Sequence, residues 1–69
     1  MEELIEPLSP REMEILSYVA SGDSNKEIAA RLVISEGTVK NHLSSILAKL
    51  SAKDRLQAVI RARNLGLIN

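Results

Sequence analysis

The feature that most constrains the fold is the spacing of apolar residues between Ser35 and Leu50. At 100° per residue, the apolar side chains of this segment fall on one stripe, made by Val39, Leu43, Ile46, Leu47 and Leu50. This spacing predicts a helix over residues 36–50, about 22 Å long at 1.5 Å per residue, with one face in a core. In a chain of 69 residues, a helix of this length must contribute much of the core.

The opposite side of this predicted helix carries small and polar residues. They are Gly37, Asn41, Ser44, Ser45 and Ala48, with Thr38 and Lys40 on the flanks. A helix that only needs solvation more usually shows Glu and Lys there, whereas slim side chains suit a helix whose backbone approaches a large surface. The major groove of DNA is about 12 Å wide and admits one helix, so we interpret residues 36–50 as a recognition helix.

Two capping boxes precede this segment, Ser9 with Glu12 and Ser24 with Glu27. The first predicts a helix that ends before Gly22 and has an apolar stripe of Met13, Leu16, Val19 and Ala20. The second predicts a short helix that buries Ile28, Ala29 and Leu32. The turn that follows is brief and contains no glycine. Two helices joined in this way, over about residues 23–42, form a helix-turn-helix arrangement.

A fourth helix is predicted over residues 55–65, with Asp54 as its N-cap and Gly66 at its end. This helix has more apolar surface than so small a domain easily buries. The surplus either packs under the other helices or forms a self-association patch, and the sequence favours neither. The candidate dimer-interface residues are Val59, Ile60, Ala62 and Arg63.

We therefore expect an all-α fold, a four-helix, bundle-like domain with a central helix-turn-helix. Residues 8–67 would form the domain, and residues 1–7, which are acidic and end in proline, a linker or mobile N-terminal stub.

Composition excludes several classes of function. The chain has no cysteine and one histidine, which leaves no plausible zinc site and favours an intracellular, cytoplasmic protein. No apolar run approaches the roughly 18 residues of a membrane span. No nucleophile, base and orienting group can be assembled, so neither an enzyme nor a cofactor is expected.

The net charge of zero conceals a polarity along the chain. Residues 1–36 carry three Lys or Arg and eight Asp or Glu, a net −5, whereas residues 37–69 carry six basic residues and one acidic residue, a net +5. A domain polarised in this way can present a basic face to phosphates while its acidic part points away.

Four ordered blocks make the pattern specific: L-S-P-R-E-x-E-I-L from Leu8, G-x-S-N-K-E-I-A-x-x-L from Gly22, I-S-x-x-T-V-K-N-H from Ile34 and K-L-x-x-x-x-R-x-Q-A-V from Lys49. Together they resemble the LuxR/GerE helix-turn-helix domain, the C-terminal output module of NarL/FixJ-type response regulators and of quorum-sensing regulators. The resemblance extends to about Leu67. One departure is Ser51-Ala52, where the family commonly has Gly-Val.

The resemblance implies a four-helix domain that binds paired promoter half-sites as a dimer, with a receiver or sensor domain upstream and RNA polymerase as a further partner. Carried over position by position, the base contacts fall on Lys40, Asn41 and Ser44. The phosphate contacts fall on Asn25, Lys26, Ser35, Thr38 and Lys49. From its place on the outer face, we add Ser45 as a phosphate contact.

Some of these residues have structural interpretations as well. Ser35 serves equally as a plain N-cap. His42 could donate to a phosphate or act as a pH-sensitive group, but at the edge of the apolar stripe it is more readily a packing residue bonded near one of the first two helices. Glu12 and Arg55 are expected to form an ion pair between the first and fourth helices. At the level of function, the alternatives are a protein-interaction module that no longer binds DNA and a promoter-element module of a sigma factor.

Overall fold

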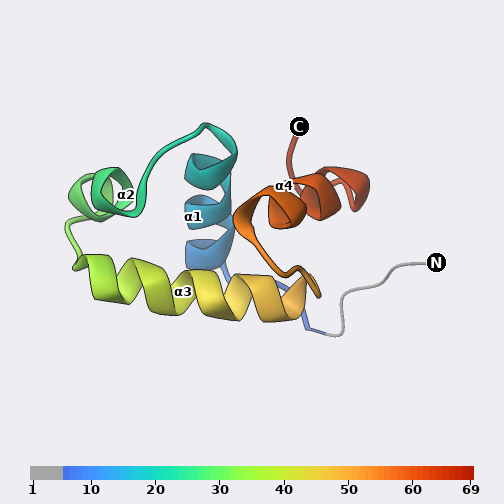
Figure 1. Ribbon diagram of the computed structural model, residues 1–69, viewed down its shortest axis with the longest axis horizontal. Helices are drawn as coiled ribbons and strands as arrows, with labels where there is room; N and C mark the ends of the chain where they lie inside the picture. The colour runs from blue at the N-terminus through green and yellow to red at the C-terminus, as the bar shows by residue number, and fades with distance from the viewer. Residues whose placement is uncertain (1–5) are drawn as a thin grey trace.

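The computed structural model describes residues 6–69, and most of the expected N-terminal stub, residues 1–5, lies outside the described part. Within residues 6–69 the chain forms four helices and no strand: α1 (Pro10–Ala20), α2 (Asn25–Leu32), α3 (Glu36–Lys49) and α4 (Arg55–Asn64). Figure 1 shows α3 running along one side of the domain, with α1, α2 and α4 all on its other side. The predicted all-α fold with a central helix-turn-helix is confirmed.

Every helix begins at a side-chain cap. Ser9, Ser24, Ser35 and Asp54 each accept a hydrogen bond from the backbone N–H three residues later, which satisfies one donor of the first turn. In α1 and α2 the box is reciprocal, because Glu12 and Glu27 accept from the backbone N–H of Ser9 and Ser24 at 2.8 and 2.9 Å. The helix starts predicted from these residues are confirmed.

The core lies between α3 and the three helices beside it. Its fully buried members are Ile15, Leu16, Ile28, Val39, Ile46 and Ala62. The predicted stripe of the first helix missed Ile15, while Met13 and Ala20 from that stripe are only half-buried. The reason is that α1 packs against both α3 and α4, so its buried face is turned and widened relative to a single stripe.

Two turns place a non-glycine residue in the left-handed region of backbone space. Val33 ends α2 with φ +56° and ψ +48°, and Ser51 follows α3 with φ +53°. The turn of the helix-turn-helix is therefore made by a β-branched residue, whose side chain is 89% exposed. The conformation of Ser51 is one that glycine adopts without strain, so the departure from Gly-Val noted in the sequence falls at a position where glycine would be favoured.

Candidate nucleic-acid interface

The outer face of α3 is open. Along the described part of the chain its residues Glu36, Gly37, Thr38, Lys40, Asn41, Ser44 and Ala48 are all exposed. The opposite face places Val39, Leu43 and Ile46 in the core. Because α1, α2 and α4 all pack on that buried side (Figure 1), nothing in residues 6–69 covers the outer face.

The predicted base-contacting residues share this open face. Lys40, Asn41 and Ser44 lie at positions i, i+1 and i+4, and all three are exposed. The Ser44 hydroxyl donates to the Lys40 carbonyl oxygen at 3.1 Å, which leaves its lone pairs available as acceptors. The side chains of Lys40 and Asn41 have no hydrogen-bond partner among the described residues.

Four of the residues predicted to contact phosphates lie at two helix N-termini. At the start of α3, Ser35 Oγ accepts from the Thr38 N–H at 3.0 Å and lies 2.8 Å from Thr38 Oγ1. At the start of α2, Lys26 is exposed and Asn25 is half-buried. The first amides of a helix lack intrahelical acceptors and carry partial positive charge, so both ends suit an anion.

Ser45 and Lys49 differ from the other predicted contacts, because both are bonded inside the molecule. Ser45 Oγ donates to Glu12 Oε2 at 2.7 Å, and Lys49 Nζ donates to Glu12 Oε1 at 2.8 Å and to the Pro7 carbonyl at 3.3 Å. These bonds fasten α3 to the start of α1. The side chains of Ser45 and Lys49 therefore have a structural role in this conformation.

Glu12, at the centre of this cluster, is only 4% exposed. Burial by itself raises the pKa of its carboxyl group. The hydrogen bonds from Lys49, the Ser9 backbone and Ser45, together with the charge of Lys49, outweigh burial and lower the pKa from 4.5 to about 2. The carboxylate is thus charged at neutral pH and paired.

The expected ion pair between Glu12 and Arg55 is wrong, because Glu12 pairs with Lys49 of α3 instead. Arg55 turns to the start of α2: its Nη1 donates to Asn25 Oδ1 and its Nη2 to the Asp23 carbonyl at 2.7 Å. Both contacts join residues about 30 positions apart, so no local pattern indicated them.

The outward surface of α4 also differs from the prediction. Val59 and Ala62, proposed as interface residues, are 8% and 0% exposed and belong to the core. Ile60 and Arg63 are exposed, as an interface requires, and Leu56, which was not among the candidates, is 70% exposed. The reason is that α4 packs on α1, and this packing buries the face of α4 that carries Val59 and Ala62.

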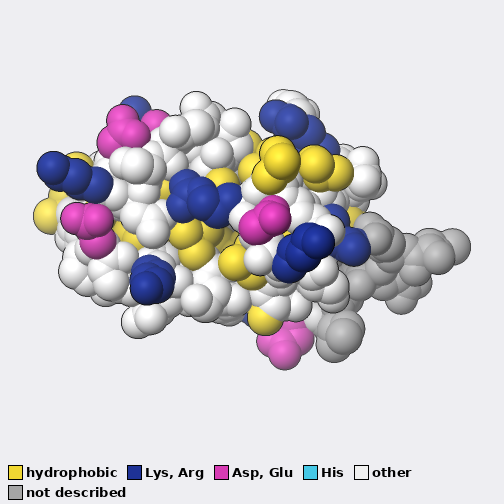
Figure 2. Space-filling view, in the orientation of Figure 1, with side chains coloured by type: hydrophobic (Ala, Val, Ile, Leu, Met, Phe, Trp, Pro, Cys, Tyr) yellow, Lys and Arg dark blue, Asp and Glu magenta, His cyan; other side chains and the backbone are white. Residues whose placement is uncertain are grey.

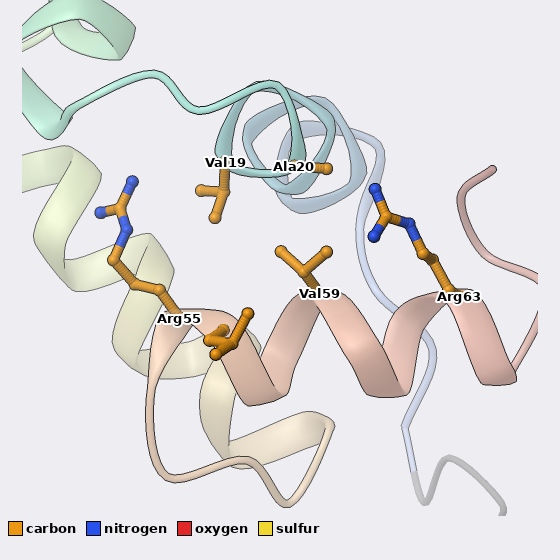
Figure 3. Close-up of a pocket in the computed structure, with 6 residues that line it drawn as sticks. Val19, Ala20, Arg55, Val59 and Arg63 are labelled. Carbon is orange, nitrogen blue, oxygen red and sulfur yellow. The ribbon is translucent and has the colours of Figure 1, made fainter.

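An open groove of about 310 Å³ runs between the end of α1 and α4 (Figure 3). Its floor is Val19, Ala20 and Val59, and Arg55 and Arg63 stand at its two ends.

The half-buried His42 makes no hydrogen bond to any residue between 6 and 69, so its predicted bond near the first two helices is absent there.

Charge is distributed less simply than along the sequence. On the face drawn in Figure 2, Lys and Arg side chains alternate with Asp and Glu and do not form one basic patch.

Within the described residues, no three His, Cys, Asp or Glu side chains gather as a metal site would require. The same part of the chain contains no helix long and apolar enough to cross a membrane.

Comparison with known proteins gives the site its context. Residues 6–62 match the family model for bacterial regulatory proteins of the luxR family. The chain is 54% identical over 66 residues to the response regulator protein VraR of Staphylococcus aureus, covering 96% of this chain and 32% of VraR. It thus spans about a third of the length of such curated relatives.

Two solved structures share the fold. The transcription factor GerE superposes with a TM-score of 0.84 at 39% identity, over 90% of this chain and 92% of GerE. The Vibrio cholera protein VqmA, in a complex with ligand and DNA, also gives a TM-score of 0.84, at 25% identity, over 97% of this chain and 29% of VqmA. By the extent of the family match and the shared four-helix fold, this chain belongs to the LuxR family of bacterial regulatory proteins.

Proposed function

We propose that this chain is the sequence-specific DNA-binding domain of a bacterial transcription regulator, with α3 in the major groove. The observation that carries the proposal is the slim, exposed, hydrogen-bonding face of α3, opposite an apolar face that is buried in the core. The relative VqmA, whose fold is shared, has been solved with DNA, which supports the same partner here.

Affinity in this proposal comes from phosphate contacts. Lys26 and Asn25 at the start of α2, and Ser35 and Thr38 at the start of α3, face the DNA backbone from two helix N-termini. These contacts do not depend on sequence, and neutralising a phosphate releases counterions, so binding weakens as salt rises. Ser45 and Lys49 are left out of this set because the side chains of both are hydrogen-bonded to Glu12.

Specificity comes from the middle of α3. Lys40 can donate to guanine O6 and N7, and Asn41 can pair with adenine N6 and N7 in the major groove. Ser44 adds one short hydroxyl with little discrimination of its own. All three side chains are exposed, so no rearrangement of the domain precedes contact with the bases.

Pairing of two domains would set the spacing of half-sites. The exposed residues of α4, Leu56, Ile60 and Arg63, form the surface through which a homodimer assembles on DNA in this proposal. Half-sites one helical turn apart, about 34 Å, match the symmetry of such a dimer.

The chain would act as the output module of a longer, cytoplasmic regulator that carries a receiver or sensor domain before this one. The relative VraR is a response regulator three times the length of the match, which supports this arrangement. RNA polymerase is the further partner that a promoter-bound regulator of this kind would contact.

One binding experiment tests the proposal. Affinity is measured across salt for a random-sequence duplex and for candidate promoter fragments, with wild type, Lys26→Ala and Asn41→Ala. Lys26→Ala should weaken all duplexes alike and reduce the salt slope by about one, whereas Asn41→Ala should relax preference at one base pair by roughly 1–3 kcal/mol. Absence of salt-dependent binding at low salt would favour the interaction module instead.

A further inference from the structure

Arg55 links α4 to the start of α2 through two hydrogen bonds from one guanidinium group. The acceptors are the Asn25 side-chain oxygen and the Asp23 carbonyl oxygen, which flank the α2 N-cap Ser24 on either side. Figure 3 shows the Arg55 side chain leaving the first turn of α4 toward the connection between α1 and α2. Arg55 is half-buried, and these two are the side-chain hydrogen bonds that it makes within residues 6–69.

This bond determines which way the Asn25 amide faces. Arginine has five N–H donors and no acceptor, so the atom of Asn25 that meets it must be the oxygen. The Asn25 NH₂ group, with two donors, therefore lies at the far end of the amide. No residue within 6–69 accepts a hydrogen bond from it.

Resting on the proposed function, we propose that Arg55 is a positioning residue for DNA binding. By holding the Asn25 oxygen, it directs the Asn25 NH₂ group outward from the start of α2 to donate to a DNA phosphate beside Lys26. A free asparagine amide populates both orientations and several rotamers, so an amide fixed in advance loses less conformational entropy on binding. Arg55 itself lies in α4 and acts only through Asn25.

A double-mutant cycle tests this coupling. Affinity for a random-sequence duplex at low salt is measured for wild type, Arg55→Met, Asn25→Ala and the double variant. We expect each single change to weaken binding roughly tenfold and the double variant to be no weaker than either, because both remove the same contact. Lys53→Met removes an exposed charge near the start of α4 and should combine additively with Asn25→Ala.

A second variant keeps the test informative if Arg55→Met does not fold. Asn25→Asp retains an acceptor for Arg55 but has no N–H donor. Its negative charge lies beside Arg55 and in the first turn of α2, so its Tm should be no lower than that of wild type, while duplex binding falls at least roughly tenfold. Additive effects of Arg55→Met and Asn25→Ala, or wild-type affinity in Asn25→Asp, would overturn the positioning role.

The two proposals fail in different ways. If wild type binds the duplex and Asn41→Ala alters base preference, but Arg55 and Asn25 act independently, only the positioning role falls. If wild type shows no salt-dependent binding to any duplex, the proposed function falls and the positioning role with it.

Discussion

At the scale of single residues, Val33 is the position where local preference and global fold disagree most. A β-branched residue is unfavourable in the left-handed region, at a cost of about 1–2 kcal/mol. Its side chain is 89% exposed and therefore contributes little packing energy to the fold. The turn between α2 and α3 thus exists because the helices around it are well capped and packed, not because Val33 favours it.

Replacing Val33 should therefore stabilise the domain. Asparagine tolerates the left-handed conformation, so Val33→Asn is expected to raise the free energy of unfolding by about 1 kcal/mol, or Tm by about 4–8 °C in a domain of this size. Val33→Ala, which keeps most of the strain, is the control and should gain less. Thermal unfolding by circular dichroism checks both, and a lower Tm for Val33→Asn would contradict the strain argument.

Glu12 gives the fold a pH dependence whose direction follows from its lowered pKa. Because the folded-state pKa is about 2 and the ordinary value is 4.5, the stabilisation is complete above the ordinary value and is lost as the pH falls toward about 2. Glu12→Gln should remove on the order of 2 kcal/mol at neutral pH and progressively less below about pH 4.

The measurement for Glu12 is chemical unfolding at several pH values for wild type, Glu12→Gln and the exposed control Glu14→Gln. We expect the gap between wild type and Glu12→Gln to close on acidification. A gap of the same size at all pH values would show that packing, and not the charge of Glu12, stabilises the start of α1.

At the scale of elements, α3 has one face buried in the core and one face exposed, and the two faces carry different kinds of side chain. Gly37 lies in the first turn of α3, on its exposed face, and glycine is a weaker helix former than alanine. A Cβ added there would meet only Ser35 Oγ, at 3.8 Å, so no neighbour in the domain demands the glycine. We propose that Gly37 gives the α3 backbone clearance to approach the DNA.

Gly37→Ala should accordingly have opposite effects on stability and on binding. The variant is expected to gain up to about 1 kcal/mol from helix propensity, while its methyl group obstructs the approach to DNA and weakens binding severalfold. Thermal unfolding and duplex affinity are measured on the same preparation. Raised stability with unchanged affinity would mean that Gly37 does not lie against the DNA.

Sequence reasoning succeeded where the determinants are local. The caps at Ser9, Ser24, Ser35 and Asp54, and the apolar spacing of α3, set the four helices because each depends on residues three or four positions apart. It failed for contacts between elements. The Glu12–Lys49 pair spans 37 positions and depends on how α1 crosses α3, which no local pattern encodes.

At the scale of the whole molecule, the domain measures 36 × 20 × 20 Å, and few large apolar side chains are exposed among residues 6–69. Leu56 and Ile60 of α4 are two of the three large apolar side chains exposed within the described residues. They lie one helical turn apart, on a helix that packs its other face on α1. This arrangement leaves a compact apolar surface on α4, and it is the surface through which we propose that two copies of the chain pair.

Glutamate placed at Leu56 or at Val59 distinguishes the exposed surface of α4 from its buried face. Leu56→Glu should leave folding and single half-site binding unchanged and abolish cooperative binding to paired half-sites. Val59→Glu, which places a charge at a side chain 8% exposed, should unfold the domain. Thermal unfolding and band shifts on one-site and two-site duplexes check both, and cooperative binding by Leu56→Glu would place the interface elsewhere.

The central claim is that the exposed face of α3 enters the DNA groove, and amide chemical-shift mapping tests it most directly. On titration with a single half-site duplex, we predict the largest changes at residues 36–44 and at the start of α2, with residues 56–63 of α4 nearly unchanged. Changes confined to α4 and its groove, with α3 unaffected, would contradict the account.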